Sequence, residues 1–108
     1  MRAGRAARVA LLILSVSAGG ATSAAGGEHR IVIRAADYVP RQMTVRAGDT
    51  VEWVNEDIVA HTATDKARGW EVTVSPAETG RVTLQTPGTV DYFCRFHPNM
   101  TGTILVVP

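Results

Sequence analysis

Short segments in which apolar and polar residues alternate follow one another from about residue 29 to the end of the chain. A period of two is typical of a β-strand with one buried face. No segment carries the apolar stripe of an amphipathic helix, and residues 65–69, polar and ending in glycine, are predicted as a loop or a single turn. Seven strands are predicted, over residues 29–35, 42–46, 50–55, 70–74, 80–85, 89–93 and 103–107. Strands of this length and spacing predict an all-β sandwich or barrel.

The alternation also predicts which side chains face the core. Val51 and Trp53 are expected to point inward and Glu52 outward. The last segment, 103–107, is almost wholly apolar, which predicts a strand with both faces covered. The same reasoning predicts five further core residues: Met43, Val82, Leu84, Val90 and Tyr92. Since burial alone explains aromatic residues at such positions, Trp53 and Tyr92 are interpreted as core residues rather than electron conduits.

The first 25 residues have the pattern of a signal peptide. Arg2, Arg5 and Arg8 precede an apolar run over residues 9–16, and small residues at 23–25 offer a cleavage site. The run is shorter than the ~20 apolar residues that a spanning helix needs. We expect residues 1–25 to be removed, leaving one domain over 26–108; an uncleaved N-terminal anchor is the alternative. No adjacent arginine pair supports a twin-arginine signal.

Charge and cysteine content narrow the function. The whole chain has 11 basic and 10 acidic residues; without the three early arginines it has eight basic residues and a net charge of −2. No basic patch remains to favour nucleic acid as a partner. The single cysteine, Cys94, cannot form an internal disulfide. In an exported protein such a cysteine indicates a reactive thiol, an intermolecular bond or a metal ligand.

The residues after Cys94 favour a metal ligand. Cys94, His97 and Met100 bring a thiol, an imidazole and a thioether within seven residues, and His61 offers a second imidazole from a separate loop 33 residues before Cys94. Two histidines, a cysteine and a weak axial methionine are the donor set of a blue-copper site. Zinc is disfavoured, because structural zinc prefers four cysteine or histidine donors and binds thioether poorly. With three histidines in the chain, a second copper centre of the kind found in multicopper enzymes is not expected.

Each donor also has a plainer interpretation. Taken alone, Cys94 would be an inert buried residue, Met100 core filler and His61 a satisfied histidine. His29 is expected to be solvated near the new N-terminus; only cleavage after Gly26 would create an amino-terminal copper motif there.

Two runs of sequence resemble the cupredoxin family. One is residues 89–100, Thr-Val-Asp-Tyr-Phe-Cys-Arg-Phe-His-Pro-Asn-Met, and the other is residues 47–55, Ala-Gly-Asp-Thr-Val-Glu-Trp-Val-Asn, followed by His61. The Cys-x-x-His-x-x-Met spacing resembles the amicyanins more than the plastocyanins or pseudoazurins. The resemblance extends over residues 31–107. It implies an eight-stranded Greek-key sandwich, one mononuclear type 1 copper and single-electron transfer in the periplasm.

The resemblance also implies roles for the two histidines. His97 would be partly exposed and act as the electron port, leaving copper on protonation in the reduced protein, and His61 would be more buried. The sequence departs from the family pattern at Thr62, where asparagine usually braces the cysteine loop; a hydroxyl can make a similar bond. Arg95 and Asn99 are further departures, and they argue against the methylamine-oxidising partner of the amicyanins.

The sequence therefore predicts a small periplasmic electron carrier that is not an enzyme. We expect a monomer with a redox donor and acceptor as partners and no stable membrane insertion. Phe96 and Pro98, on either side of His97, could form an apolar docking patch or an ordinary small exposed patch. The main alternative is a periplasmic copper carrier or storage protein using the same site, and a metal-free binding sandwich is the third.

Overall fold

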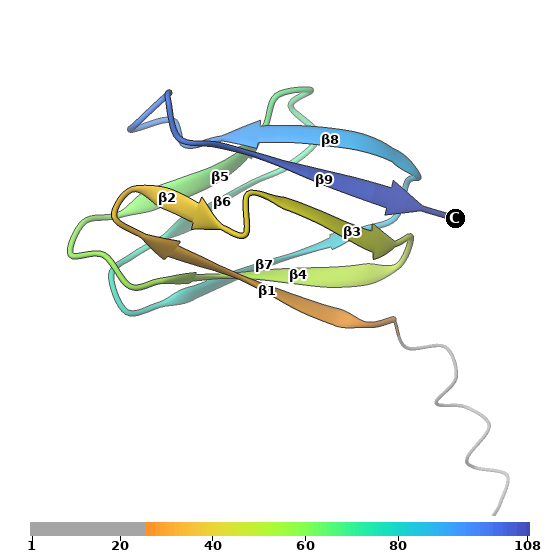
Figure 1. Cartoon of the computed structure of the whole chain (residues 1–108), viewed down its shortest axis with the longest axis horizontal. Helices are drawn as coiled ribbons and strands as arrows, with labels where there is room; N and C mark the ends of the chain where they lie inside the picture. Colours follow the sequence, from red (N-terminus) through yellow and green to blue (C-terminus); the bar gives the residue numbers. More distant parts are fainter. Residues whose placement is uncertain (1–25) are drawn as a thin grey trace, which may run out of the picture.

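The computed structural model describes residues 26–108, so the predicted signal peptide, residues 1–25, lies outside the described residues. The described chain forms two β-sheets that face each other (Figure 1). Its nine strands are β1 (Glu28–Arg34), β2 (Asp37–Val39), β3 (Gln42–Arg46), β4 (Asp49–Asn55), β5 (His61–Asp65), β6 (Glu71–Val74), β7 (Thr79–Leu84), β8 (Gly88–Phe93) and β9 (Thr101–Val107). Residues 26–108 contain no helix that is long and apolar enough to cross a membrane.

Both sheets mix parallel and antiparallel neighbours. One has the strand order β2-β1-β4-β7, with β1 parallel to β4, and the other the order β3-β9-β8-β5-β6, with β3 parallel to β9. The predicted all-β sandwich is confirmed. The described strands number nine rather than the eight implied by the family resemblance, and the shortest of them, β2, pairs with β1.

Two strands, β2 and β5, were not predicted from the sequence pattern, for different reasons. β2 has three residues, too few to show a pattern, and follows a two-residue turn at Ala35 and Ala36, whose φ angles are 53° and 56°. β5, His-Thr-Ala-Thr-Asp, lacks apolar alternation although four of its five residues are buried. His61 is therefore the first residue of a strand and not, as predicted, part of a loop.

Aromatic rings fill the space between the sheets. Trp53 and Tyr92 are fully buried, as predicted, and their ring centroids lie 5.5 Å apart. Tyr38 packs on Tyr92 at 4.6 Å. Val51 and Leu84 are buried as well, and Met43, Val82 and Val90 pack against the core. This rigid core supports the strand ends described below.

One prediction about strand faces is wrong, and another is correct for a residue that is nevertheless buried. The prediction that both faces of β9 are covered is wrong: Ile104 and Val106 are buried, but Leu105 is 43% exposed, because no element within residues 26–108 packs on the outer face of this sheet. Glu52 does lie on the outer face of its sheet, yet it is buried, since Arg30 and Arg81 both pair with its carboxylate.

Candidate metal centre

One end of the sandwich brings the candidate ligands together. Cys94 follows the last residue of β8, and His97 and Met100 lie in the loop that leads into β9. His61 opens β5, at the same end of the molecule (Figure 1). The turn of the chain between neighbouring strands thus places a thiol, two imidazoles and a thioether at one edge.

The donor atoms have the spacing of a trigonal site. Cys94 Sγ lies 3.8 Å from His61 Nδ1 and 3.7 Å from His97 Nδ1. Ligand atoms from the three residues all lie within 4.8 Å of one another. Bonds of about 2.1 Å to nitrogen and about 2.3 Å to sulfur, meeting at about 120°, would put the two ligand atoms about 3.8 Å apart. The two sulfur-to-nitrogen distances therefore fit a single ion held by all three residues.

The ligand loop is closed by its own backbone. The amide of Cys94 donates to the Met100 carbonyl at 3.0 Å, that of His97 to the Cys94 carbonyl at 3.2 Å, and that of Met100 to the His97 carbonyl at 2.8 Å. Met100 is 3% exposed, so its thioether belongs to the interior. Three bonds within seven residues restrict this loop to one shape.

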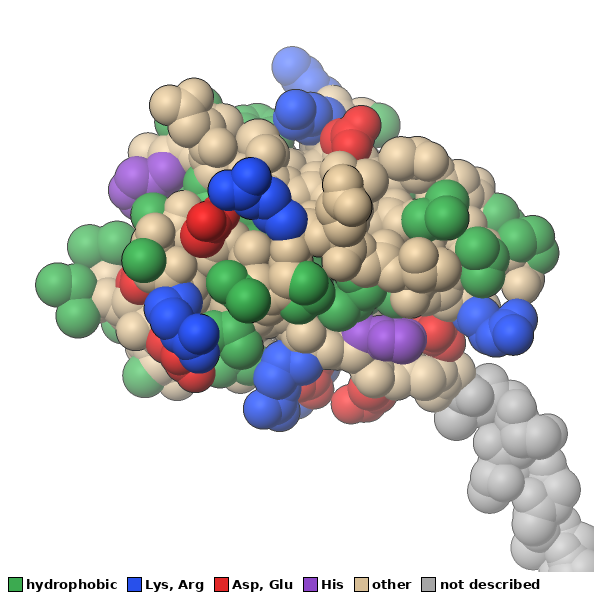
Figure 2. Space-filling view, viewed as in Figure 1, with side chains coloured by type: hydrophobic (Ala, Val, Ile, Leu, Met, Phe, Trp, Pro, Cys, Tyr) green, Lys and Arg blue, Asp and Glu red, His purple; other side chains and the backbone are tan. Residues whose placement is uncertain are grey.

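Burial differs sharply across the site. His61 and Cys94 are fully buried, whereas His97 reaches the surface, as the family resemblance implied. Around it are exposed Pro98 and half-exposed Phe96. Figure 2 shows hydrophobic side chains and a histidine at this end of the molecule. The site is closed on the His61 side and open on the His97 side.

A carboxylate orients the buried histidine. His61 Nε2 lies 2.8 Å from Asp57 Oδ2, and Asp57 also accepts the amides of Ala35 at 2.7 Å and Ala36 at 2.8 Å. Burial disfavours the charged form of Asp57, but these bonds outweigh it and hold its pKa below the usual value. With the proton on Nε2 donated to Asp57, the Nδ1 lone pair faces Cys94. No local sequence pattern indicates this role of Asp57, because its partners lie more than 20 residues away at Ala35 and Ala36.

Thr62 ties the His61 strand to the cysteine. Its amide donates to Cys94 Sγ at 3.3 Å, and its hydroxyl accepts the Arg95 amide at 2.8 Å. The hydroxyl thus makes the bracing bond proposed from the sequence. The amide thus fixes the position of the cysteine sulfur, and the thiolate is the form in which a cysteine binds metal.

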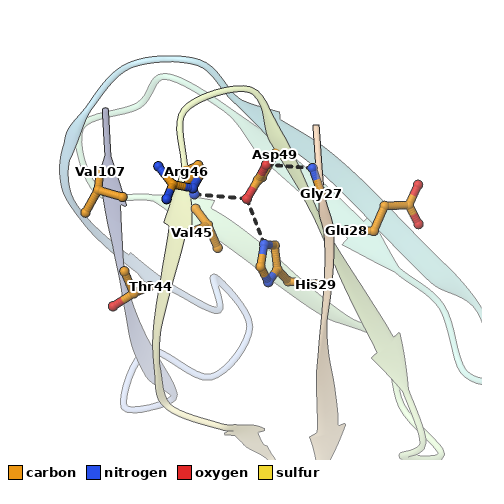
Figure 3. A pocket seen from close by; sticks show the side chains of 8 residues that line it. All are labelled: Gly27, Glu28, His29, Thr44, Val45, Arg46, Asp49 and Val107. Atoms are coloured by element: carbon orange, nitrogen blue, oxygen red, sulfur yellow. Dashed lines mark hydrogen bonds and ion pairs between the residues drawn. The ribbon is translucent and has the colours of Figure 1, made fainter. Parts of the chain in front are cut away.

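The third histidine lies elsewhere. His29 is at the opposite end of the sandwich, half-buried, with Nε2 2.8 Å from Asp49 Oδ2 (Figure 3). The prediction that it is merely solvated is therefore wrong. Asp49 also accepts the amides of Arg46 and Gly27, and these bonds, the Arg46 amide foremost, lower the pKa of Asp49 to about 2. This arrangement secures the start of β1.

Comparisons with known proteins agree with this geometry. A family model described as the cupredoxin-like domain matches residues 6–106. Amicyanin from Paracoccus versutus is 34% identical over 77 residues, covering 64% of this chain and 57% of its own. Plastocyanin from Prochlorothrix hollandica is 35% identical over 81 residues, covering 64% and 62%. The chain thus spans less than two thirds of these two relatives.

Solved structures show the same fold. The crystal structure of amicyanin from Paracoccus versutus has a TM-score of 0.65 and 29% identity, over 73% of this chain and 80% of that one. A copper-containing nitrite reductase from Thermus scotoductus has a TM-score of 0.69 and 26% identity, over 75% of this chain but 22% of the enzyme. The fold therefore occurs both as a small protein and within a larger enzyme.

Proposed function

Because the chain belongs to the cupredoxin-like domain family, we propose that it is a small type 1 copper protein that carries single electrons between redox partners. The observation that supports this most directly is the trigonal spacing of one cysteine sulfur and two histidine nitrogens at a strand end. The relatives amicyanin and plastocyanin each match 64% of this chain.

The donor set fits copper. The proposed ligands are His61, Cys94 and His97 in the trigonal plane, with Met100 as the weak axial donor. Thiolate and thioether are soft donors that suit copper(I), and imidazole suits both oxidation states. When bound, copper would supply a one-electron couple.

The protein's own contribution is a site that barely moves. His61 is oriented by Asp57, the ligand loop is closed by three backbone bonds, and Cys94 is fully buried. Preorganised ligands keep the rearrangement on electron transfer small, and burial excludes water from the sulfur. Electrons would enter and leave at His97, the ligand side chain that reaches the surface.

We propose that a redox partner docks around His97. Phe96 is 50% exposed, and Val59 and Ile58, in the loop before His61, are 48% and 93% exposed. Apolar side chains in such number at one end favour a transient protein contact, since isolated exposed apolar residues are ordinary but clusters mark interaction surfaces. The partners would be a redox donor and a redox acceptor.

The proposal includes export to the periplasm, with residues 1–25 as the cleaved signal peptide and 26–108 as a monomeric domain. The basic start and short apolar run of the sequence support it. A catalytic role is not proposed. The nitrite reductase is a far longer chain, and the histidine that this chain does not use at the site lies at the other end, bonded to Asp49.

The test is the visible spectrum of the 26–108 domain after one equivalent of copper(II). An intense blue or green band that a mild reductant bleaches is expected, and Cys94→Ser should abolish it while leaving the fold intact. A colourless wild-type protein, or one that retains only copper(I), would instead support a copper carrier.

A further inference from the structure

A ring of hydrogen bonds beside the cysteine joins residues that the ligand set does not include. The Arg95 amide donates to Thr62 Oγ1 at 2.8 Å, and Thr62 Oγ1 lies 2.9 Å from Thr64 Oγ1. Thr64 donates to Glu71 Oε1 at 2.9 Å. The ring closes because the Arg95 side chain binds both carboxylate oxygens of Glu71, at 2.7 and 2.9 Å.

The proton positions in this ring are determined. A carboxylate only accepts, so Thr64 gives its single hydroxyl proton to Glu71. The Thr62 hydroxyl must therefore donate to Thr64, which leaves the Thr62 oxygen free to accept the Arg95 amide. The bonds from Arg95, and then from Thr64, hold the pKa of Glu71 below its usual value, so the carboxylate is ionised at neutral pH. The two threonine hydroxyls each donate once and accept once, while Arg95 only donates and Glu71 only accepts.

The ring replaces backbone pairing at the place where two strands separate. β5 and β8 pair only at Thr64 with Phe93 and Asp65 with Tyr92. Beyond that point β5 extends back to His61 and the end of β8 leads to Cys94. No backbone pairing between β5 and β8 therefore joins the two segments that carry these ligands. The bond from the Arg95 amide to Thr62 spans this gap, one residue from each ligand.

We propose that Glu71 and Arg95, acting through Thr64 and Thr62, are positioning residues that hold the backbone at Cys94 in its ligand-binding shape. The role is one of orientation. A half-exposed ion pair contributes little to global stability, and the side chains of Arg95 and Glu71 are 49% and 36% exposed. A bidentate pair nevertheless restricts geometry strongly. This inference rests on the proposed function for its purpose, although the ring itself can be tested without copper.

Thr64→Val tests the ring, because valine has the shape of threonine without the hydroxyl. Thr64→Ser restores the hydroxyl. Thr83→Val is the matched control, since Thr83 forms a cross-strand hydroxyl pair with Thr50 at 2.8 Å in the other sheet. Amide hydrogen exchange is measured by NMR on the 26–108 domain, metal-free and with copper(I). The visible spectrum of the copper(II) form is recorded in parallel.

Thr64→Val should accelerate exchange of the Arg95 amide roughly five- to tenfold, the effect of about one lost hydrogen bond, and should shift the sulfur-to-copper band. Thr64→Ser and Thr83→Val should stay within about twofold of wild type and keep its band. If Thr64→Val does not fold, Glu71→Gln opens the ring at the surface and should accelerate the same amide. Exchange at the wild-type rate in the folded ring variant, or equal acceleration in Thr83→Val, would overturn the proposal. A wild-type domain that never becomes coloured would refute the proposed electron-carrier function and leave the exchange result standing.

Discussion

Replacing Asp57 by asparagine changes a residue that orients a proposed metal ligand, His61, and leaves all of the proposed ligands in the chain. Asp57 accepts three hydrogen bonds, from the amides of Ala35 and Ala36 and from His61 Nε2. An asparagine has nearly the same shape but one acceptor oxygen instead of two. Wherever that oxygen points, its amino group faces at least one N–H group that has lost its partner.

The magnitude follows from those bonds. If the amide oxygen takes the Oδ2 position, the bonds from Ala36 and His61 survive without charge and the bond from Ala35 is lost. One hydrogen bond to a charged group contributes about 1.5–3 kcal/mol. Water can reach the Ala35 amide, but loss of the charge also weakens the bond to the fully buried His61. We expect Asp57→Asn to lower the free energy of unfolding by about 2–3 kcal/mol.

Urea unfolding of the metal-free domain at neutral pH measures this. With a slope near 1 kcal/mol per molar, the midpoint should fall by about 2–3 M. Asp37→Asn is the control: this carboxylate is 44% exposed and paired with Arg41, so its loss should cost about 0.5 kcal/mol or less. A deficit for Asp57→Asn no larger than that of the control would refute the reasoning.

The stability difference between the wild type and Asp57→Asn should also depend on pH. The pKa of Asp57 is lower in the folded protein than in the unfolded chain, so its stabilisation is complete above about pH 4 and is lost as the pH falls through the lowered value. The two proteins should therefore converge in stability in acid. A gap that persists unchanged there would show that the charge of Asp57 is not the cause.

Three further variants address the frame around the site. Ala36→Gly should stabilise the domain by about 1 kcal/mol and raise Tm by about 4–8 °C, because glycine adopts the positive φ of 56° without strain; an unchanged or lower Tm in a circular dichroism melt would contradict this. Gly102→Ala should destabilise it by about 1–3 kcal/mol in urea, since a Cβ there would overlap the ring of Tyr92. Asp49→Asn should lower Tm at neutral pH and much less near pH 2, because the Asp49 pKa of about 2 means that its contribution is lost as the pH falls from about 4 to 2; equal losses at both pH values would count against the carboxylate.

How far the sequence predicts the fold depends on how local each signal is. The strands with clear alternation, such as β4 and β7, lie where the pattern places them. β5 was not predicted because its buried residues are largely polar and give no apolar alternation: His61 and Thr62 are both fully buried next to Cys94. Burial of polar residues is possible only when each has a partner, and those partners come from distant parts of the chain.

The site likewise contains both residues that a local sequence pattern predicts and residues that it does not. The donors Cys94, His97 and Met100 lie within one short loop, so their types and spacing are readable from sequence. Their orientation is not, because Asp57 and Glu71 act across strands: Glu71 lies 24 residues before Arg95, and Asp57 contacts a turn more than 20 residues away. Only the pairing of the sheets brings these groups together.

This division has a functional consequence. Substituting a donor removes a metal bond, whereas substituting Asp57 or Glu71 leaves every donor atom in the chain and changes how firmly it is held. Variants of the first kind should differ from wild type chiefly in whether they bind copper. Variants of the second kind should still bind copper, because all the donors remain, but with an altered spectrum, amide exchange or stability. Electron transfer should change as well, since the accompanying rearrangement depends on how firmly the ligands are held. The residues that tune electron transfer are therefore to be sought in the hydrogen bonds around Cys94 and His61 as much as in the ligand loop.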